Sequence, residues 1–291
     1  MRRVVLASAL SLALAACSLL VSTDDLTGGP TSDAGSPADA GRDAPVDAPH
    51  PPPPPPPPPV SVDGGSSPYR DAVLADAPLS YWRFGETSGT TAKDEMGAHD
   101  GTYAGEFTLG AQGALMNESS TAVTLANGAV DMGDVYGFEG RAPFTVEAWV
   151  KPALLDSSYR NVYTKLTAGY PRTGHFLWAQ SGALAFERNL DWVYMDGGSQ
   201  ETVGVANGVP ESVWTHLVAT YDGMTQTIFV NGVAADDGPS TASLTATGTH
   251  LLVGSADETG GVWVGEIDEL AIYGKALAAE RVAAHFAASG R

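Results

Sequence analysis

Apolar and polar residues alternate over most of the chain from residue 68 onwards. Since successive side chains of a strand point to opposite faces of its sheet, this alternation predicts half-buried β-strands. The clearest example is 213–221 (VWTHLVATY), where Leu217 and Ala219 share one face and Trp214 and His216 share the other. The same period predicts further strands at 79–84, 122–125, 144–151, 161–166, 175–179, 183–187, 225–230, 233–235, 250–254 and 262–273.

Turn and helix signals complete this outline. Asp222-Gly223 and Asn231-Gly232 each separate two predicted strands, and both dipeptides tolerate the positive φ of tight hairpin turns. Only 278–288 has apolar residues at helical spacing. Many short antiparallel strands followed by one terminal helix predict an all-β fold, a two-sheet antiparallel jelly-roll sandwich with a short C-terminal helix. The roughly 224 residues of 68–291 fit one large domain rather than two.

The N-terminal residues are typical of an export signal. Arg2 and Arg3 precede an apolar run, 4–16, that is too short to span a bilayer as a mature helix. The run ends LAAC, at Cys17, which resembles the lipobox of bacterial lipoproteins. The resemblance implies that 1–16 is a signal peptide, that the Cys17 thiol is lipidated, and that the exported protein is anchored to the cell envelope at the outer membrane. An ordinary secretory signal that contains a cysteine is the alternative.

Residues 17–67 are expected to form a disordered linker. Asp, Ala, Gly, Ser and Pro predominate in 23–67, and such a segment cannot bury enough apolar surface to offset its ordering entropy. Residues 51–59 are an unbroken run of prolines, which predicts a polyproline II rod about 28 Å long. We interpret the segment as an acidic spacer that holds the following domain off the membrane. A docking site for a proline-binding module is the alternative.

Composition excludes several classes of function. The chain has 15 basic and 34 acidic residues, a formal net charge of −19, so it does not hold nucleic acids by charge. Seven acids lie in the linker against one basic residue, Arg42. Most of the negative charge therefore belongs to the predicted domain and favours a neutral or cationic partner. The single cysteine, Cys17, excludes an internal disulfide and a cysteine-rich zinc site.

Several sequence blocks resemble laminin-G-like (concanavalin A-like) jelly-roll domains. In family order they lie at 82–86 with 94–103, at 144–152 (FTVEAWVKP), at 214–223 with 229–232, and at 265–273 (GEIDELAIY) followed by a short helix. Together they cover essentially all of 68–291. The resemblance implies a sandwich fold, but it does not fix the function, because this fold carries lectins, enzymes and adhesion modules.

Carboxylates in two of these blocks are candidates for a metal site. The apolar set of the last strand, 262–273, changes parity at Asp268-Glu269, which predicts a β-bulge that re-aims a carboxylate. Resemblance to calcium-binding family members implies Ca²⁺ at Asp94 and Asp268, completed by backbone carbonyls, with Asp100 as a lesser candidate. The alternative is that these carboxylates accept local backbone N–H groups or form an Asx turn.

The acids of the last strand also raise the question of catalysis. Glu266, Asp268 and Glu269 superficially resemble the catalytic strand of family 16 glucanases, in which three acids alternate with apolar residues on one face. Retaining hydrolysis needs two carboxyl groups about 5 Å apart. Here Glu269 falls one position early and Leu270 takes the third acid position, so we predict no enzymatic activity. His216 has no nucleophile motif beside it and is interpreted as a buried sheet histidine.

Aromatic and charged residues between strands are candidates for ligand binding. Tyr159 with Arg160, and Trp192 with Tyr194, which share a face by parity, are suited to stack on sugar rings and to bond their hydroxyls. Burial in the core is the alternative for Trp192 and Tyr194, and it is the interpretation adopted for Trp178. The predicted function is non-catalytic binding of a glycan, or of a cell-surface or matrix protein, by a lipid-anchored domain. A hydrolase and a purely structural or adhesive module are the alternatives.

Overall fold

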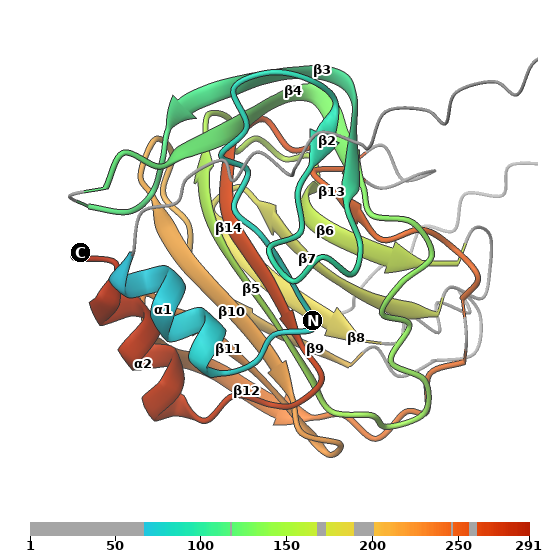
Figure 1. The fold of residues 1–291 in the computed structure, drawn as a ribbon. Coiled ribbons are helices and arrows are strands. Elements are labelled where there is room, and N and C mark those ends of the chain that lie inside the picture. The colour runs from blue at the N-terminus through green and yellow to red at the C-terminus, as the bar shows by residue number, and fades with distance from the viewer. Residues whose placement is uncertain (1–66, 117, 168–172, 189–200, 246, 256–260) are drawn as a thin grey trace, which may run out of the picture. The chain divides into compact units, whose positions relative to one another are not determined.

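The computed structural model describes residues 67–116, 118–167, 173–188, 201–245, 247–255 and 261–291 (Figure 1). The predicted signal peptide, Cys17, the proline run and the rest of the linker up to residue 66 lie outside the described residues. The same holds for the segment that contains Trp192 and Tyr194.

The described residues are mostly β-structure with two short helices. In chain order the elements are α1 (Pro68–Ala75), β1 (Ser80–Trp82), β2 (Thr91–Ala92), β3 (Gly101–Gln112), β4 (Thr121–Asp131), β5 (Phe144–Pro152), β6 (Arg160–Leu166), β7 (Gly174–Gln180), β8 (Ala183–Arg188), β9 (Thr202–Val205), β10 (Thr215–Tyr221), β11 (Thr225–Val230), β12 (Val233–Pro239), β13 (Leu252–Val253), β14 (Gly265–Tyr273) and α2 (Ala279–Ala288).

Antiparallel pairing links the strands in the order β12-β11-β10-β5-β14-β4-β13-β6-β7-β8-β9, with β1 paired to β14 and β3 to β4. The ladder curves back so that the layer containing β10, β5 and β14 faces the layer containing β6, β7 and β8 (Figure 1). The two edge strands of the ladder, β9 and β12, lie close together, and the Gly204 N–H of β9 donates to Asp236 Oδ2 of β12 at 2.8 Å. The predicted all-β sandwich of antiparallel strands is confirmed.

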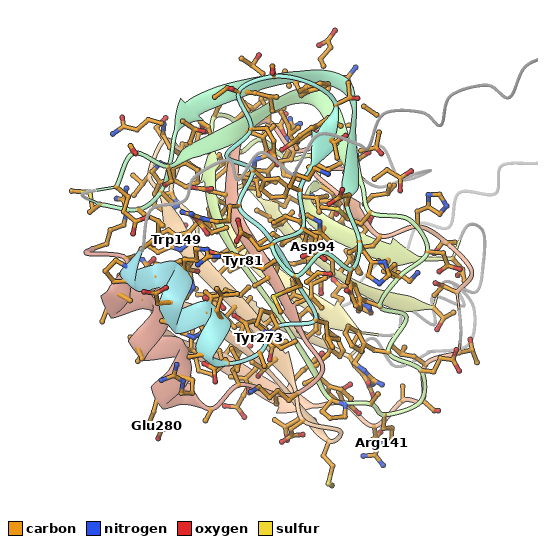
Figure 2. The ribbon with its side chains drawn as sticks, in the orientation of Figure 1. Tyr81, Asp94, Arg141, Trp149, Tyr273 and Glu280 are labelled. Atoms are coloured by element: carbon orange, nitrogen blue, oxygen red, sulfur yellow. The ribbon has the colours of Figure 1, made fainter. Side chains whose placement is uncertain are left out.

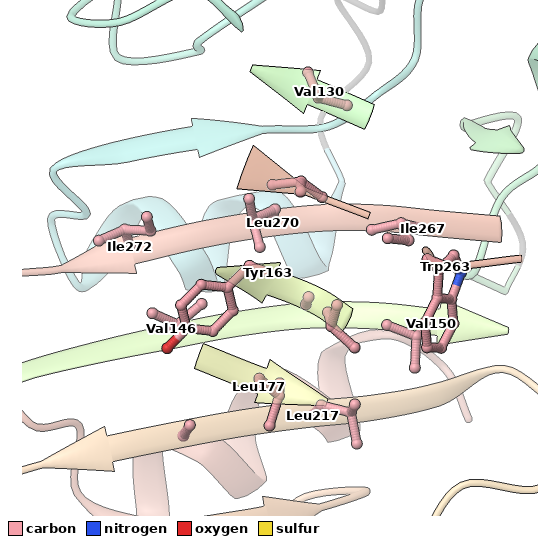
Figure 3. Packing of buried hydrophobic residues seen from close by; sticks show 14 of the residues in the cluster. Val130, Val146, Val150, Tyr163, Leu177, Leu217, Trp263, Ile267, Leu270 and Ile272 are labelled. Atoms are coloured by element: carbon pink, nitrogen blue, oxygen red, sulfur yellow. The ribbon is translucent and has the colours of Figure 1, made fainter. Parts of the chain in front are cut away.

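Apolar side chains fill the space between the two layers. Leu217 of β10, Val146 of β5 and Ile267 of β14 lie in this cluster and meet Leu177 of β7 from the opposite layer (Figure 3). Full burial of one such side chain contributes about 1.5–3 kcal/mol. The predicted alternation in β10 is confirmed, since Leu217 belongs to this core and Val218 to a second cluster on the outer face of the sheet.

Two helices cover that second cluster. α2 confirms the predicted C-terminal helix, whereas α1 contradicts the expectation that only one segment is helical. Helix α1 has clear local signals, because Ser67 Oγ accepts the Arg70 N–H at 3.1 Å and Pro68 stands at the first helical position. Its eight residues are too few for the periodicity test that identified α2. No helix among the described residues has the length and apolarity to cross a bilayer.

Both predicted hairpins form, but one turn is displaced. Asn231 and Gly232 have φ of +50° and +79°, as a primed turn requires. In the other hairpin Gly223 (φ +102°) and Met224 are the central pair. Asp222 instead accepts the Met224 N–H on its Oδ1 at 2.8 Å, so it caps the turn and keeps an ordinary backbone conformation.

The predicted bulge in β14 is confirmed. The register against β5 shifts between Asp268 and Ala271, and Glu269 has a φ of +51°. A left-handed conformation is uncommon for a residue other than glycine. It turns both carboxyl side chains, Asp268 and Glu269, into the interior, where each is fully buried.

Candidate functional site

The two layers of the sandwich differ in what covers their outer faces. Helices α1 and α2 pack on the layer of β5, β10 and β14, where Trp149 and Tyr273 are buried beside them (Figure 2). On the other layer, the outward side chains of β6, β7 and β8 include Trp178, and Tyr159 just before β6 is 48% exposed. Tyr159 and Asp156 meet solvent here, whereas Trp178 and Arg160 are only partly exposed. These aromatic and charged groups make this part of the face the candidate binding site.

Trp178 lies on this outer face and not in the core. Its neighbours Leu177 and Ala179 fill the space between the layers, so parity turns Trp178 outward. It is partly buried, and its cross-strand partner on β8 is the small Ala185. Trp178 therefore does not belong to the core between the layers, where the sequence predicted it, but packs partly buried against a small cluster of Leu166 and Phe176.

Contacts on both sides fix the Trp178 ring. Its Nε1–H donates to Glu187 Oε1 of β8 at 2.8 Å. The Tyr159 ring packs edge-to-face against it, with 4.8 Å between the ring centroids. An aromatic pair of this kind is worth about 0.5–1.5 kcal/mol beyond its buried area. The orientation of both rings is thus set before any ligand arrives.

A charged pair borders these rings. Arg160 Nη2 lies 2.7 Å from Asp156 Oδ2, and its Nη1 donates to the Val262 carbonyl at 3.0 Å. The Ser158 N–H and the Arg160 guanidinium hold the pKa of Asp156 below its usual range. Asp156 is therefore an ionised acceptor at neutral pH, and its side chain is 42% exposed.

We call this set the aromatic platform and define it as Tyr159, Trp178, Glu187, Arg160 and Asp156. The structure brings the predicted Tyr159 and Arg160 into it, whereas Trp192 and Tyr194 lie outside the described residues. Sequence reasoning missed Asp156 and Glu187. The four-residue spacing from Asp156 to Arg160 hints at their ion pair, but the contact between Trp178 and Glu187 depends on the register of β7 and β8.

Asp94, the first calcium candidate, is surrounded by hydrogen-bond donors (Figure 2 shows it beside Tyr81). Its two carboxylate oxygens accept from the Tyr81, Met96, Ala98 and His99 N–H groups at 2.8–3.0 Å and from Ser80 Oγ at 2.8 Å. Oxygens that face this many N–H groups are not free to face a cation as well. Asp94 thus holds the loop after β2 and the start of β1 together.

Asp268, the second candidate, is equally enclosed. It is fully buried, and its Oδ2 accepts the Ala114 N–H at 2.7 Å. Burial and the adjacent Glu269 carboxylate raise the pKa of Asp268 well above its usual value. This environment disfavours the ionised form of the carboxyl group, which is the form that binds Ca²⁺.

Asp100 has partners of its own, since its Oδ2 lies 2.6 Å from Lys93 Nζ and its Oδ1 accepts the Asp94 N–H at 3.0 Å. The described residues hold no cluster of three or more His, Cys, Asp or Glu side chains suited to a metal ion. In this arrangement Asp94, Asp100 and Asp268 do not fit a calcium site, and their contacts match the local-capping alternative. Calcium binding stays a prediction, which a thermal melt with and without chelator tests.

The acids of β14 are unsuited to hydrolysis in this arrangement. Asp268 and Glu269 are fully buried, and Glu269 receives Arg83 Nε and Nη2 at 3.0 and 2.9 Å. Glu266 lies 3.1 Å from Lys151 Nζ. Two of the three acids therefore cannot touch a saccharide from solution.

Comparison with known proteins places the fold in a family. A family profile described as the Concanavalin A-like lectin/glucanases superfamily matches residues 117–283. The chain belongs to this superfamily. No curated protein sequence matches it.

Several solved structures have a similar fold at low sequence identity. Domain 4 of AbnA, a GH43 extracellular arabinanase from Geobacillus stearothermophilus solved in complex with arabinotriose, is 20% identical, with a TM-score of 0.53 over 72% of this chain and 97% of that chain. The binding domain of Paraclostridial Mosquitocidal Protein 1 is 13% identical (TM-score 0.54, 73% of this chain) and that of botulinum neurotoxin serotype D 10% identical (TM-score 0.53, 74%). The match spans 52% of each toxin domain, about half its length.

Proposed function

We propose that this concanavalin A-like domain is a non-catalytic module that binds a glycan through the aromatic platform. The observation that carries the proposal is the fixed Tyr159–Trp178 pair beside Arg160 and Asp156, on the layer opposite the one that α1 and α2 cover. Aromatic rings stack on the apolar faces of sugars, and fixed polar groups give orientation to the hydroxyls. The arabinanase domain of the same fold was solved with arabinotriose.

Charge favours a neutral glycan over an acidic one. Three of the 15 basic and seven of the 34 acidic residues precede Ser67, so the domain itself carries a formal charge of −15. Such a charge repels sulfated or uronic-acid polymers at low ionic strength. A neutral polysaccharide meets no such barrier at the platform.

The lipid anchor and the spacer belong to the same proposal. Cleavage before Cys17 and lipidation of its thiol would attach the exported chain to the outer membrane, and the acidic, proline-rich linker would hold the domain away from the bilayer. Incorporation of labelled palmitate in the bacterial host, with Cys17→Ser as the control that abolishes it, tests the anchor. A wild-type chain that takes up no label would contradict it.

Loss of either platform ring is expected to weaken glycan binding by on the order of tenfold, which corresponds to about 1.4 kcal/mol. The test begins with a glycan array of the full chain, run with and without calcium, followed by calorimetry on the best neutral hit. Trp178→Ala and Tyr159→Ala should both lose affinity, whereas Met224→Ala, at a side chain 66% exposed on the β10–β11 turn, should not.

Other outcomes redirect the proposal. Binding that survives both platform variants but is lost in Trp192→Ala plus Tyr194→Ala would move the site to that segment. An array without hits, together with capture of a purified matrix protein, would replace the glycan by a protein partner. Release of reducing sugar from any bound glycan would contradict the non-catalytic role.

A further inference from the structure

A buried charge network lies on the helix-covered face, away from the aromatic platform. Glu147 of β5 is fully buried, yet its carboxylate oxygens accept hydrogen bonds from side chains on four different elements. The donors are Tyr69 Oη of α1, His216 Nε2 of β10 and Tyr273 Oη of β14, each at 2.8 Å, and His285 Nδ1 of α2 at 3.0 Å. The carboxylate therefore joins both helices to two neighbouring strands.

His285 has a carboxylate on each side of its ring. Its Nδ1 faces Glu147 Oε2 at 3.0 Å, and its Nε2 faces Asp76 Oδ2, at the end of α1, at 2.9 Å. A neutral imidazole has only one N–H, so it can donate to only one of two ionised carboxylates. Both contacts form together when the ring is a doubly protonated imidazolium.

The two carboxylates are indeed ionised at neutral pH. Burial alone would raise the pKa of Glu147, but the hydrogen bonds from His216 and His285 outweigh it and hold that pKa far below its usual range. Burial acts on Asp76 in the same sense, and the hydrogen bonds from Arg281 and His285 lower its pKa on balance. Arg281 Nε lies 2.7 Å from Asp76 Oδ2, which ties α2 to the end of α1 a second time.

We propose that charged His285 holds α1 and α2 on the sheet, and that its deprotonation at alkaline pH releases the two helices while the sandwich stays folded. The neutral ring would lose one of its two hydrogen bonds and leave a buried carboxylate without its charged donor. Loss of one partner from such a buried pair is strongly unfavourable. The core between the layers does not include these residues. The sandwich is therefore expected to stay folded when the helices detach.

The direction of the pH dependence follows from the shift of His285. Burial would lower its pKa, but Glu147 and Asp76 outweigh burial and raise it above the ordinary 6.5. The stabilisation is therefore complete below about pH 6.5 and is lost as the pH rises through the raised value. On the acid side the lowered pKa of Glu147 keeps the network intact well below the ordinary value of about 4.3.

Other ionisable groups face the network and must be separated from His285. Three are tyrosines whose pKa values burial raises well above 10, Tyr69, Tyr81 and Tyr273. Three are cations near the helices, Lys275, Arg281 and Arg291. The remaining two are His216, which contacts Glu147, and Glu269, which contacts Tyr81. Burial keeps the three tyrosines protonated between pH 6 and 9. Burial raises the pKa of Glu269 to about 7, so this carboxyl group titrates in the same range as His285. Glu269 and His216, the other imidazole on Glu147, therefore each need a variant of their own.

Hydrogen exchange of the full chain between pH 6 and 9.5, corrected for the intrinsic exchange rate, tests the proposal. Protection of α1 and α2 is expected to fall at least tenfold over this range, while β5 and β14 keep theirs. His285→Gln should have weakly protected helices at every pH. His216→Gln, Glu269→Gln, and His250→Gln at the exposed pair with Asp131, should each keep the pH dependence of the wild type.

A histidine NMR titration of the wild-type chain decides the matter even where a variant fails to fold. A His285 ring that titrates at or below pH 6.5 would overturn the proposal. The same conclusion would follow from helix protection that does not change with pH, or from sheet and helices losing protection together.

Discussion

Glu147→Gln is expected to lower the free energy of unfolding by about 3–5 kcal/mol, the usual cost of removing one partner from a buried ion pair. The carboxylate receives four donor groups in a fully buried position. An amide offers one acceptor oxygen and turns its NH₂ group toward donors that it cannot satisfy. It also removes the negative charge that faces His285.

Urea unfolding of the full chain at pH 6 measures this loss, with the denaturant slope as a check that both proteins unfold the same surface. Asp131→Asn is the matched control, because Asp131 pairs with His250 at 2.8 Å where both side chains are exposed. An exposed pair is worth about 0–1 kcal/mol. A loss below about 1 kcal/mol in Glu147→Gln would mean that apolar packing of α1 and α2, and not the network, holds the helices.

The loss should also depend on pH in a definite direction. Because the folded-state pKa of Glu147 is lowered, its contribution is present above the unfolded value of about 4.3 and disappears only as the pH falls further. The difference between wild type and Glu147→Gln should therefore be constant from pH 5 to 6 and shrink below pH 4.

Strands were predictable where one face is apolar. β5, β10 and β14 have regular alternation or continuous apolar residues, and the parity change at Asp268-Glu269 revealed the bulge. β3 (Gly101–Gln112) was missed although Tyr103, Phe107 and Leu109 share one face and pack in or against the core. Three glycines and many exposed positions interrupt the alternation along this strand. α1 was missed for the different reason that its eight residues hold barely two turns.

In the candidate sites, the sequence predicted only those residues that lie next to one another in the chain. Tyr159 and Arg160 are neighbours in the chain, so their joint position needed no fold. Trp178 and Glu187 meet through the register of two strands, and Glu147 meets His285, 138 positions away. The single acid in FTVEAWVK, Glu147, indicates a buried polar interaction, but the sequence does not identify the residue that it contacts. Asp94 accepts from four backbone N–H groups, an arrangement that the sequence suggested only as the alternative to a calcium site.

Arg83→Met is expected to cost about 3–5 kcal/mol at pH 8 and clearly less at pH 5. Arg83 Nε and Nη2 both donate to Glu269 Oε1, and Arg83 Nη2 lies 3.5 Å from Glu118 Oε2. Tyr81 Oη also donates to Glu269. Without the guanidinium, Glu269 would be a fully buried carboxylate next to Asp268 with a hydroxyl donor but no cation.

The pH dependence distinguishes lost charge compensation from lost packing. Burial raises the folded-state pKa of Glu269 to about 7 even though Arg83 lowers it, so removal of Arg83 is expected to raise it further above the unfolded value of about 4.3. At pH 8 the folded variant then keeps a proton that the folded wild type has largely released, so the cost of the substitution grows as the pH rises above about 7. Urea unfolding at pH 5 and 8 measures the change, with Arg70→Met, at the half-exposed pair with Glu95, as the control. A loss that is equal at both pH values would mean that Arg83 stabilises the fold through the packing of its methylene groups. A loss that grows with pH would mean that its positive charge compensates the buried Glu269 carboxylate at the β14 bulge.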